Sequence, residues 1–123
     1  MERRPLTVAI IEDDTSMRKS IERLLNAYGF AAIGFASAEA FLERQIDDAF
    51  VCAVLDVHLP GINGFELKRR LMAAGEELPI IFVTAIDDDV REYVTQAGCV
   101  AYLRKPFAPD RLLEAVKSAI AAR

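Results

Sequence analysis

The sequence predicts an α/β fold in which parallel strands alternate with helices. The first supporting observation is that five short apolar runs, several rich in β-branched residues, recur along the 123-residue chain. Near-continuous apolar runs of this length are typical of strands buried on both faces of a sheet. The second is that the segments between and after these runs repeat their apolar residues at helical spacing. This alternation favours a parallel sheet with helices on both faces.

The expected strands are residues 6–11, 30–35, 51–56, 79–84 and 100–103. The second run contains Ala and Gly and suits an edge of the sheet. Parallel strands need right-handed crossovers, and these leave few possible topologies. The flavodoxin-like doubly wound (βα)5 arrangement, with strand order 2-1-3-4-5, fits best.

Helices are expected from Asp14 or Thr15 to Gly29, from Ser37 to about residue 46, from Asn63 or Gly64 to Gly75, over residues 87–98, and over residues 109–122. Ser37 is an expected N-cap, and Gly29 and Gly75 are expected stops. The apolar positions expected to face the core are Met17, Ile21, Leu24, Leu25 and Tyr28 in the first helix, Phe65, Leu67, Leu71 and Met72 in the third, and Leu112, Leu113, Val116, Ala119 and Ile120 in the last.

Composition indicates one domain over residues 1–123, with 53% hydrophobic residues to fill a single core. No apolar run approaches the roughly 20 residues of a membrane span, and the first residues lack a secretion signal, so we expect a cytoplasmic protein. The two cysteines, Cys52 and Cys99, are expected to be reduced. A net charge of −4 without a basic stripe argues against direct binding of nucleic acid. Any link to DNA would come through another domain.

Polar residues end four of the five expected strands. Glu12 and Asp13 follow the first, Asp56 ends the third, Thr84 ends the fourth, and Lys105 follows the fifth. In the order 2-1-3-4-5 these ends share one edge, the edge at which such sheets bind ligands. Clustered carboxylates repel unless a cation neutralises them, and oxygen ligands favour Mg²⁺ or Mn²⁺. The alternative is that these are solvated acids at loop starts.

A divalent cation beside Asp56, with an ammonium and a hydroxyl nearby, is suited to phosphoryl transfer. We interpret the Asp56 carboxylate as a nucleophile that forms an acyl phosphate, and Lys105 as a group that spreads the charge of the transferred group. Thr84 can donate a hydrogen bond to a phosphoryl oxygen. The Lys105-Pro106 bond is a candidate for the cis form.

The motifs at these strand ends resemble the receiver domain of bacterial two-component response regulators. They are Glu12-Asp13, Leu55-Asp56-Val57-His58-Leu59-Pro60-Gly61, Val83-Thr84-Ala85 and Lys105-Pro106-Phe107. The resemblance covers essentially the whole chain. Residues 37–42 and 78–107 are similar to receivers of the FixJ type, which usually carry a C-terminal helix-turn-helix domain.

The resemblance implies a phosphorylation-switched signalling module that acts in transcription regulation. Asp56 would accept phosphate from a sensor histidine kinase, and the domain would catalyse only its own phosphotransfer and autodephosphorylation. Asp13 and Asp56 would bind Mg²⁺ directly, Glu12 would bind it through water, and the His58 backbone carbonyl would be a further ligand. The helix-turn-helix output domain would lie outside this chain.

The resemblance also implies that Thr84 and Tyr102 form a switch pair, and that phosphorylation promotes a homodimer. From the residues alone, Tyr102 equally suits a half-buried packing position. The His58 side chain is either solvated or tunes the lifetime of the acyl phosphate.

Two other classes compete. A flavodoxin needs a phosphate loop where the acids Glu12-Asp13-Asp14 stand, and a haloacid-dehalogenase-type phosphatase needs an acid where His58 stands. A degenerate receiver that serves only as an interaction module would lack residues that are present here, Asp56, Thr84 and Lys105. The cognate kinase, the signal and the output cannot be read from the sequence.

Overall fold

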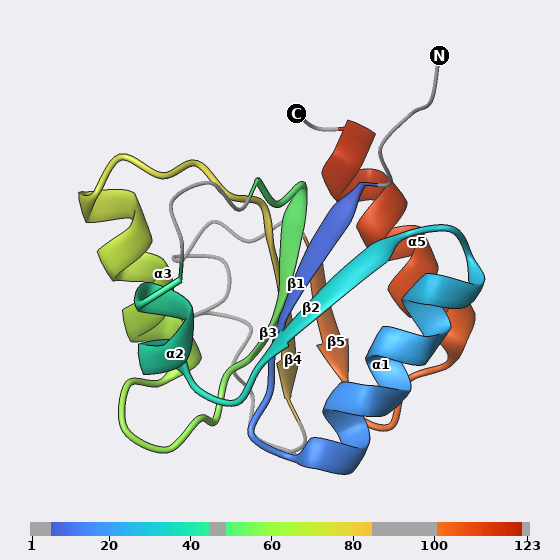
Figure 1. The fold of residues 1–123 in the computed structure, drawn as a ribbon, viewed down its shortest axis with the longest axis horizontal. Coiled ribbons are helices and arrows are strands. Elements are labelled where there is room, and N and C mark those ends of the chain that lie inside the picture. The colour runs from blue at the N-terminus through green and yellow to red at the C-terminus, as the bar shows by residue number, and fades with distance from the viewer. Residues whose placement is uncertain (1–5, 45–48, 85–100, 122–123) are drawn as a thin grey trace.

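The structure, a computed structural model, describes residues 6–44, 49–84 and 101–121. Its centre is a five-stranded parallel sheet of order β2-β1-β3-β4-β5 (Figure 1). The strands are β1 (Thr7–Ile11), β2 (Ala31–Phe35), β3 (Cys52–Asp56), β4 (Ile80–Thr84) and β5 (Ala101–Arg104). The predicted topology is therefore confirmed, including the edge position of the Gly-containing strand β2.

The described helices are α1 (Thr15–Ala27), α2 (Ala38–Leu42), α3 (Gly64–Ala73) and α5 (Pro109–Ala121). Figure 1 shows α1 and α5 on one face of the sheet and α2 and α3 on the other. The helix expected over residues 87–98 lies outside the described residues, as does Cys99. Cys52 is buried, with a relative exposure of 0%. None of the helices in the described ranges is long and apolar enough to cross a lipid bilayer.

Each of the first three described helices begins with a side-chain cap, and the predicted N-cap of α2, Ser37, is confirmed. The side chains of Asp14, Ser37 and Asn63 accept hydrogen bonds from the backbone N–H three residues further on, at 2.9 to 3.0 Å. These bonds satisfy N–H groups that have no partner within the helix. The helix starts are thus determined locally, by short polar residues placed directly before the apolar stripes.

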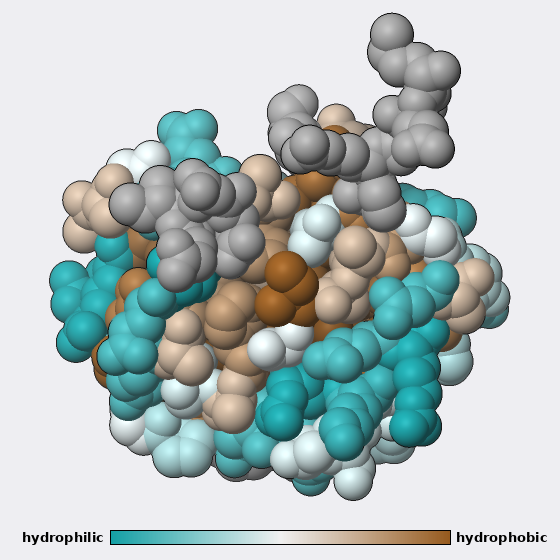
Figure 2. Space-filling view, viewed as in Figure 1, coloured by the Kyte–Doolittle hydropathy of each residue, from teal (hydrophilic) through white to brown (hydrophobic). Residues whose placement is uncertain are grey.

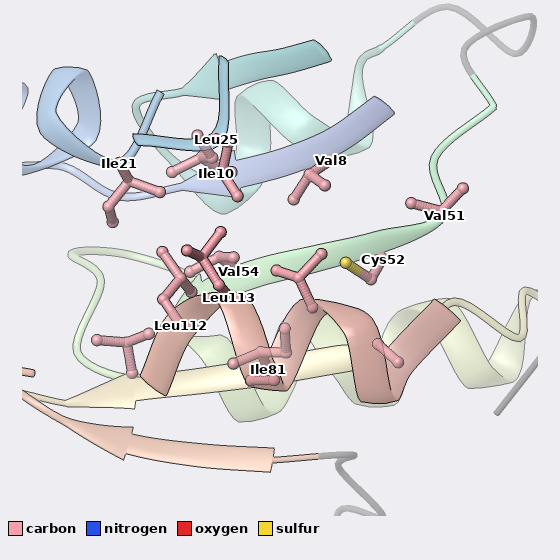
Figure 3. Packing of buried hydrophobic residues seen from close by; sticks show 14 residues of the cluster. Val8, Ile10, Ile21, Leu25, Val51, Cys52, Val54, Ile81, Leu112 and Leu113 are labelled. Carbon is pink, nitrogen blue, oxygen red and sulfur yellow. The ribbon is translucent and has the colours of Figure 1, made fainter. Parts of the chain in front are cut away.

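The sheet separates two hydrophobic clusters. One lies under α1 and α5 and contains Ile10, Val54, Ile81, Leu25 and Leu112; Figure 3 shows these side chains converging between the helices and the strands. The other lies under α2 and α3, and its members include Ile11, Leu55, Phe82, Phe41 and Leu67. Alternate residues of each strand point to opposite faces, so the continuous apolar runs fill both clusters.

Three details of the sequence prediction are wrong. Tyr28 and Met72 were expected in the core, but they are 58% and 59% exposed. Tyr28 is the C-cap of α1, beyond the last helical residue. Met72 follows the buried Leu71 and is therefore turned about 100° around the helix axis, away from the sheet. The helix α2 ends at Leu42 and not near residue 46, with Glu43 as its C-cap.

The strand and remaining helix bounds differ from the prediction by one or two residues. The strand β2 is the exposed edge of the sheet: Ile33 is 41% exposed, and Figure 2 shows hydrophobic colour over the middle of this face, beside a hydrophilic flank. The site lies beyond the carboxyl ends of the strands.

Candidate functional site

The carboxyl ends of the strands bring the predicted polar residues to one edge of the sheet. In the register, Ile11 of β1 pairs with Leu55 of β3, and the next residue of β3, Asp56, pairs with Val83 of β4. Thr84 then pairs with Arg104 of β5. Across the sheet, Glu12 is therefore level with Asp56. Thr84 lies one residue further along the strand direction, and Lys105 follows Arg104, the partner of Thr84. The prediction that these strand ends meet at a common edge is confirmed.

Three carboxylates gather at this edge. Glu12, Asp13 and Asp56 each place one carboxylate oxygen within 4.8 Å of the others. Glu12 and Asp56 are 3% and 7% exposed, whereas Asp13 is exposed. The site therefore has a buried floor, made by Glu12 and Asp56, and an open side at Asp13.

Lys105 joins the two buried acids. Its Nζ donates to Oε1 of Glu12 at 2.8 Å and lies 3.6 Å from Oδ2 of Asp56. Its backbone N–H donates to the Thr84 carbonyl at 2.7 Å, which ties the loop after β5 to the end of β4. The Lys105-Pro106 peptide bond is cis. The backbone bond holds the main chain of Lys105 beside β4, and the two acids hold its ammonium.

Burial and the neighbouring Asp56 raise the pKa of Glu12 to about 7, although Lys105 acts in the opposite direction. Burial also lowers the pKa of Lys105, but the bond to Glu12 and the charges of Asp56 and Glu12 outweigh it, so its pKa is raised overall. One ammonium therefore does not neutralise the acid cluster. This is an electrostatic environment that favours a further cation.

The two oxygens of Asp56 have different surroundings. Oδ1 accepts a hydrogen bond from the backbone N–H of His58 at 3.0 Å, while Oδ2 faces Lys105. The His58 side chain is exposed, beside an open hollow that Asp13 and the loop after β3 line. The Asp56 carboxylate is consequently held in one orientation, with access from the side of Asp13.

The expected switch residues occupy different environments. Thr84 is fully buried. The Tyr102 side chain packs against the cluster that contains Phe82, and its hydroxyl is buried without a hydrogen-bond partner among the described residues. The packing interpretation of Tyr102 therefore holds in this structure, and its role in a switch stays a prediction.

One neighbour of the site was missed by the sequence reasoning. The guanidinium of Arg18, on α1, donates to the backbone carbonyl of Glu12 at 2.8 Å. The sequence feature that could have indicated this contact is a basic residue one turn into the helix that follows the acids, on a side of the helix without apolar residues.

A family profile described as the response regulator receiver domain matches residues 8–117. The chain belongs to this family. The receiver domain is 38% identical over 114 residues to the transcriptional regulatory protein FixJ of Bradyrhizobium diazoefficiens, an alignment that covers 92% of this chain and 56% of that protein. It is 37% identical over 113 residues to nodulation protein W of the same organism, covering 91% of this chain and 50% of that protein.

Among solved structures, the receiver domain is similar to the crystal structure of FixJ-N, with a TM-score of 0.89 and 32% identity over 98% of both chains. The predicted family and flavodoxin-like fold are thus confirmed. The chain spans about half the length of the two curated relatives. A receiver domain is a signalling module, and its relatives include transcriptional regulators.

Proposed function

We propose that Asp56 is the phosphoryl acceptor of this receiver domain and that residues 1–123 form one such domain. The observation that carries the proposal is the setting of the Asp56 carboxylate. One oxygen is held by the His58 N–H, the other lies 3.6 Å from the Lys105 ammonium, and two further carboxylates lie within 4.8 Å. A nucleophile held in one orientation beside positive charge suits transfer of an anionic group.

The donor set fits Mg²⁺ or Mn²⁺. Glu12, Asp13 and Asp56 offer only hard oxygen atoms, and the described residues of the cluster include no thiol or imidazole. Asp13 and Asp56 would bind the cation directly, Glu12 would bind it through water, and the His58 carbonyl would complete the protein ligands. The cation would neutralise charge on the acceptor and on the incoming phosphoryl group.

In the proposed reaction an oxygen of Asp56 attacks the phosphorus of a phosphohistidine on a sensor kinase. The new O–P bond forms as the P–N bond breaks, and the imidazole leaves with the bonding electron pair. Lys105 lies where it can contact a phosphoryl oxygen on Asp56. Hydrolysis of the acyl phosphate by water returns the carboxylate and inorganic phosphate, so the chain catalyses only its own phosphorylation and dephosphorylation.

The acyl phosphate would carry about −1.5 to −2 charge, in place of the single negative charge of the Asp56 carboxylate, at the end of β3 and next to β4. Thr84 would then move toward this group and Tyr102 would turn further inward. The change would pass to a homodimer interface or to a helix-turn-helix output domain in a longer protein. FixJ, which is named as a transcriptional regulatory protein and is about twice as long as the aligned region, supports that role.

The first test is incubation with acetyl phosphate and Mg²⁺, followed by intact mass measurement. We expect a single phosphoryl adduct that is absent from Asp56→Asn and from samples with a chelator. Lys105→Ala should lower the yield at least tenfold, because the ammonium stabilises the transferring charge. Asp14→Asn is the matched control: its carboxylate caps α1 and lies outside the acid cluster.

Two outcomes would contradict the proposal. An adduct that persists in Asp56→Asn would place the acceptor elsewhere. The second is a folded domain that forms no adduct with either acetyl phosphate or a phosphohistidine donor. That result would favour a receiver that serves only as an interaction module.

A further inference from the structure

We propose that Arg18 is a positioning residue for the acidic turn, and that Gly34 provides the space through which it reaches that turn. This inference rests on the proposed metal site and adds to it a residue that does not touch the cation. Arg18 is partly buried on α1, and its Nη1 donates to the Glu12 carbonyl at 2.8 Å. Its Nη2 lies 3.4 Å from Oγ1 of Thr15.

The Glu12 carbonyl controls the direction of the next residue. A peptide group is planar, so the Glu12 C=O and the N and Cα atoms of Asp13 lie in one plane. The opposite side of Glu12 is also held, because its N–H donates to the Phe35 carbonyl at 3.0 Å. The bond from Arg18 therefore fixes the plane from which Asp13, the exposed acid of the cluster, departs.

Gly34 makes this contact possible. A Cβ at Gly34 would lie 2.8 Å from Cδ and 3.0 Å from Cγ of Arg18, so the stem of Arg18 occupies the space that a side chain would fill. The same Cβ would lie 2.2 Å from Oε1 of Glu22. Gly34 does not have a positive φ, so alanine is compatible with its backbone. Alanine at Gly34 should thus displace Arg18 without changing Arg18 itself.

A purely structural role and a purely electrostatic role make different predictions. If Arg18 only anchored α1 to the sheet, its loss would lower stability and leave cation affinity unchanged. If Arg18 acted only through its charge, its loss would strengthen Mg²⁺ binding, because a nearby positive charge would be gone. A positioning role predicts that loss of Arg18 weakens Mg²⁺ binding, which is the opposite of the change expected from its charge.

The experiment measures Mg²⁺ binding by isothermal titration calorimetry, and thermal unfolding without Mg²⁺, for the wild type, four single variants and the double variant Arg18→Ala/Gly34→Ala. Arg18→Ala and Gly34→Ala test the contact from its two sides. Arg18→Lys retains the charge and one donor. Arg23→Ala is the matched control, because it removes the same charge from an exposed position of the same helix.

Loss of partners that orient metal ligands typically weakens affinity 10- to 100-fold, and we expect the low end, about tenfold, for Arg18→Ala. Gly34→Ala should weaken binding in the same direction, and adding it to Arg18→Ala should have no further effect. Arg18→Lys should recover part of the affinity, and Arg23→Ala should stay at or above the wild-type affinity.

Unchanged or tighter Mg²⁺ binding by folded Arg18→Ala overturns the inference, as does a Gly34→Ala effect that adds fully to that of Arg18→Ala. If Arg18→Ala does not fold, Gly34→Ala with wild-type affinity overturns it. A wild-type domain that binds no Mg²⁺ contradicts the proposed function instead, so the two failures are distinguishable.

Discussion

At the scale of single residues, the position of Lys105 is informative. Its Nζ lies closer to Glu12 than to the proposed acceptor, at 2.8 Å against 3.6 Å. Glu12 is almost fully buried, so an unpaired charge there would be costly. The ammonium thus compensates the more buried acid while remaining beside Asp56.

The raised pKa of Glu12 predicts a pH dependence of stability. In the folded state its pKa is about 7, compared with 4.5 for an ordinary Glu, so the folded state holds this proton more tightly. The contribution of this tighter proton binding to the stability of the folded state is fully present below pH 4.5 and is lost as the pH rises through 7. Without divalent cations, this part of the unfolding free energy should fall by up to about 3 kcal/mol over that window.

Urea denaturation of the wild type and Glu12→Gln at several pH values measures this effect. Titrating groups away from the site are common to both proteins, so the difference between them reports Glu12 together with its interactions with Asp56 and Lys105. A difference that stays constant between pH 5 and pH 8 would contradict the prediction.

At the scale of elements, the helix α3 is placed directly against the end of β3. A Cβ at Gly64, the first residue of α3, would lie 2.6 Å from the Asp56 carbonyl oxygen and 3.0 Å from Cα of Val57. These are backbone atoms at the acceptor itself. The glycine therefore lets the helix start approach the strand that carries Asp56.

Gly64→Ala should destabilise the domain by roughly 1 to 3 kcal/mol, because overpacking forces the backbone to shift. It should also lower the yield of phosphorylation by acetyl phosphate, since Asp56 moves with that backbone. Thermal and urea unfolding measure the first effect, and intact mass measures the second.

Gly34→Ala is the control for Gly64→Ala in the unfolding measurements, because the three atoms nearest to its Cβ all belong to the side chains of Arg18 and Glu22. It should lower the unfolding free energy by less. Equal losses of unfolding free energy in the two variants would contradict the prediction. They would show that the backbone around Gly64 accommodates the added methyl group as easily as side chains do around Gly34.

At the scale of the whole molecule, the parallel order β2-β1-β3-β4-β5 determines the site. The topology places the ends of three strands and the loop after a fourth side by side, and the acids repel one another there. Folding therefore assembles a site that is electrostatically unfavourable until a cation binds.

Mg²⁺ should consequently stabilise the folded domain against unfolding, by about 2.7 kcal/mol at a concentration 100 times the dissociation constant. The measurement is the urea midpoint with Mg²⁺ and with potassium chloride at equal ionic strength. Asp13→Asn should reduce the gain. Equal midpoints in the two salts would contradict this prediction.

Much of this molecule follows from its sequence alone. The alternation of apolar runs and helical stripes predicted the sheet order, and the polar residues after four runs predicted which side chains would meet. Both predictions depend on periodicity and on the shared direction of parallel strands, which are properties of the chain and of backbone geometry. The caps at Asp14, Ser37 and Asn63 are equally local.

Other features depend on contacts between distant segments. The pairing of Lys105 with Glu12 joins residues 93 positions apart. The burial that raises the pKa of Glu12, the bond from Arg18 to its carbonyl, and the close approaches at Gly34 and Gly64 likewise required the folded structure. The exact packing of neighbouring elements sets these contacts, and a periodic pattern in a sequence carries no information about it. The acidic edge was therefore predictable, and the detailed geometry that supports it was not.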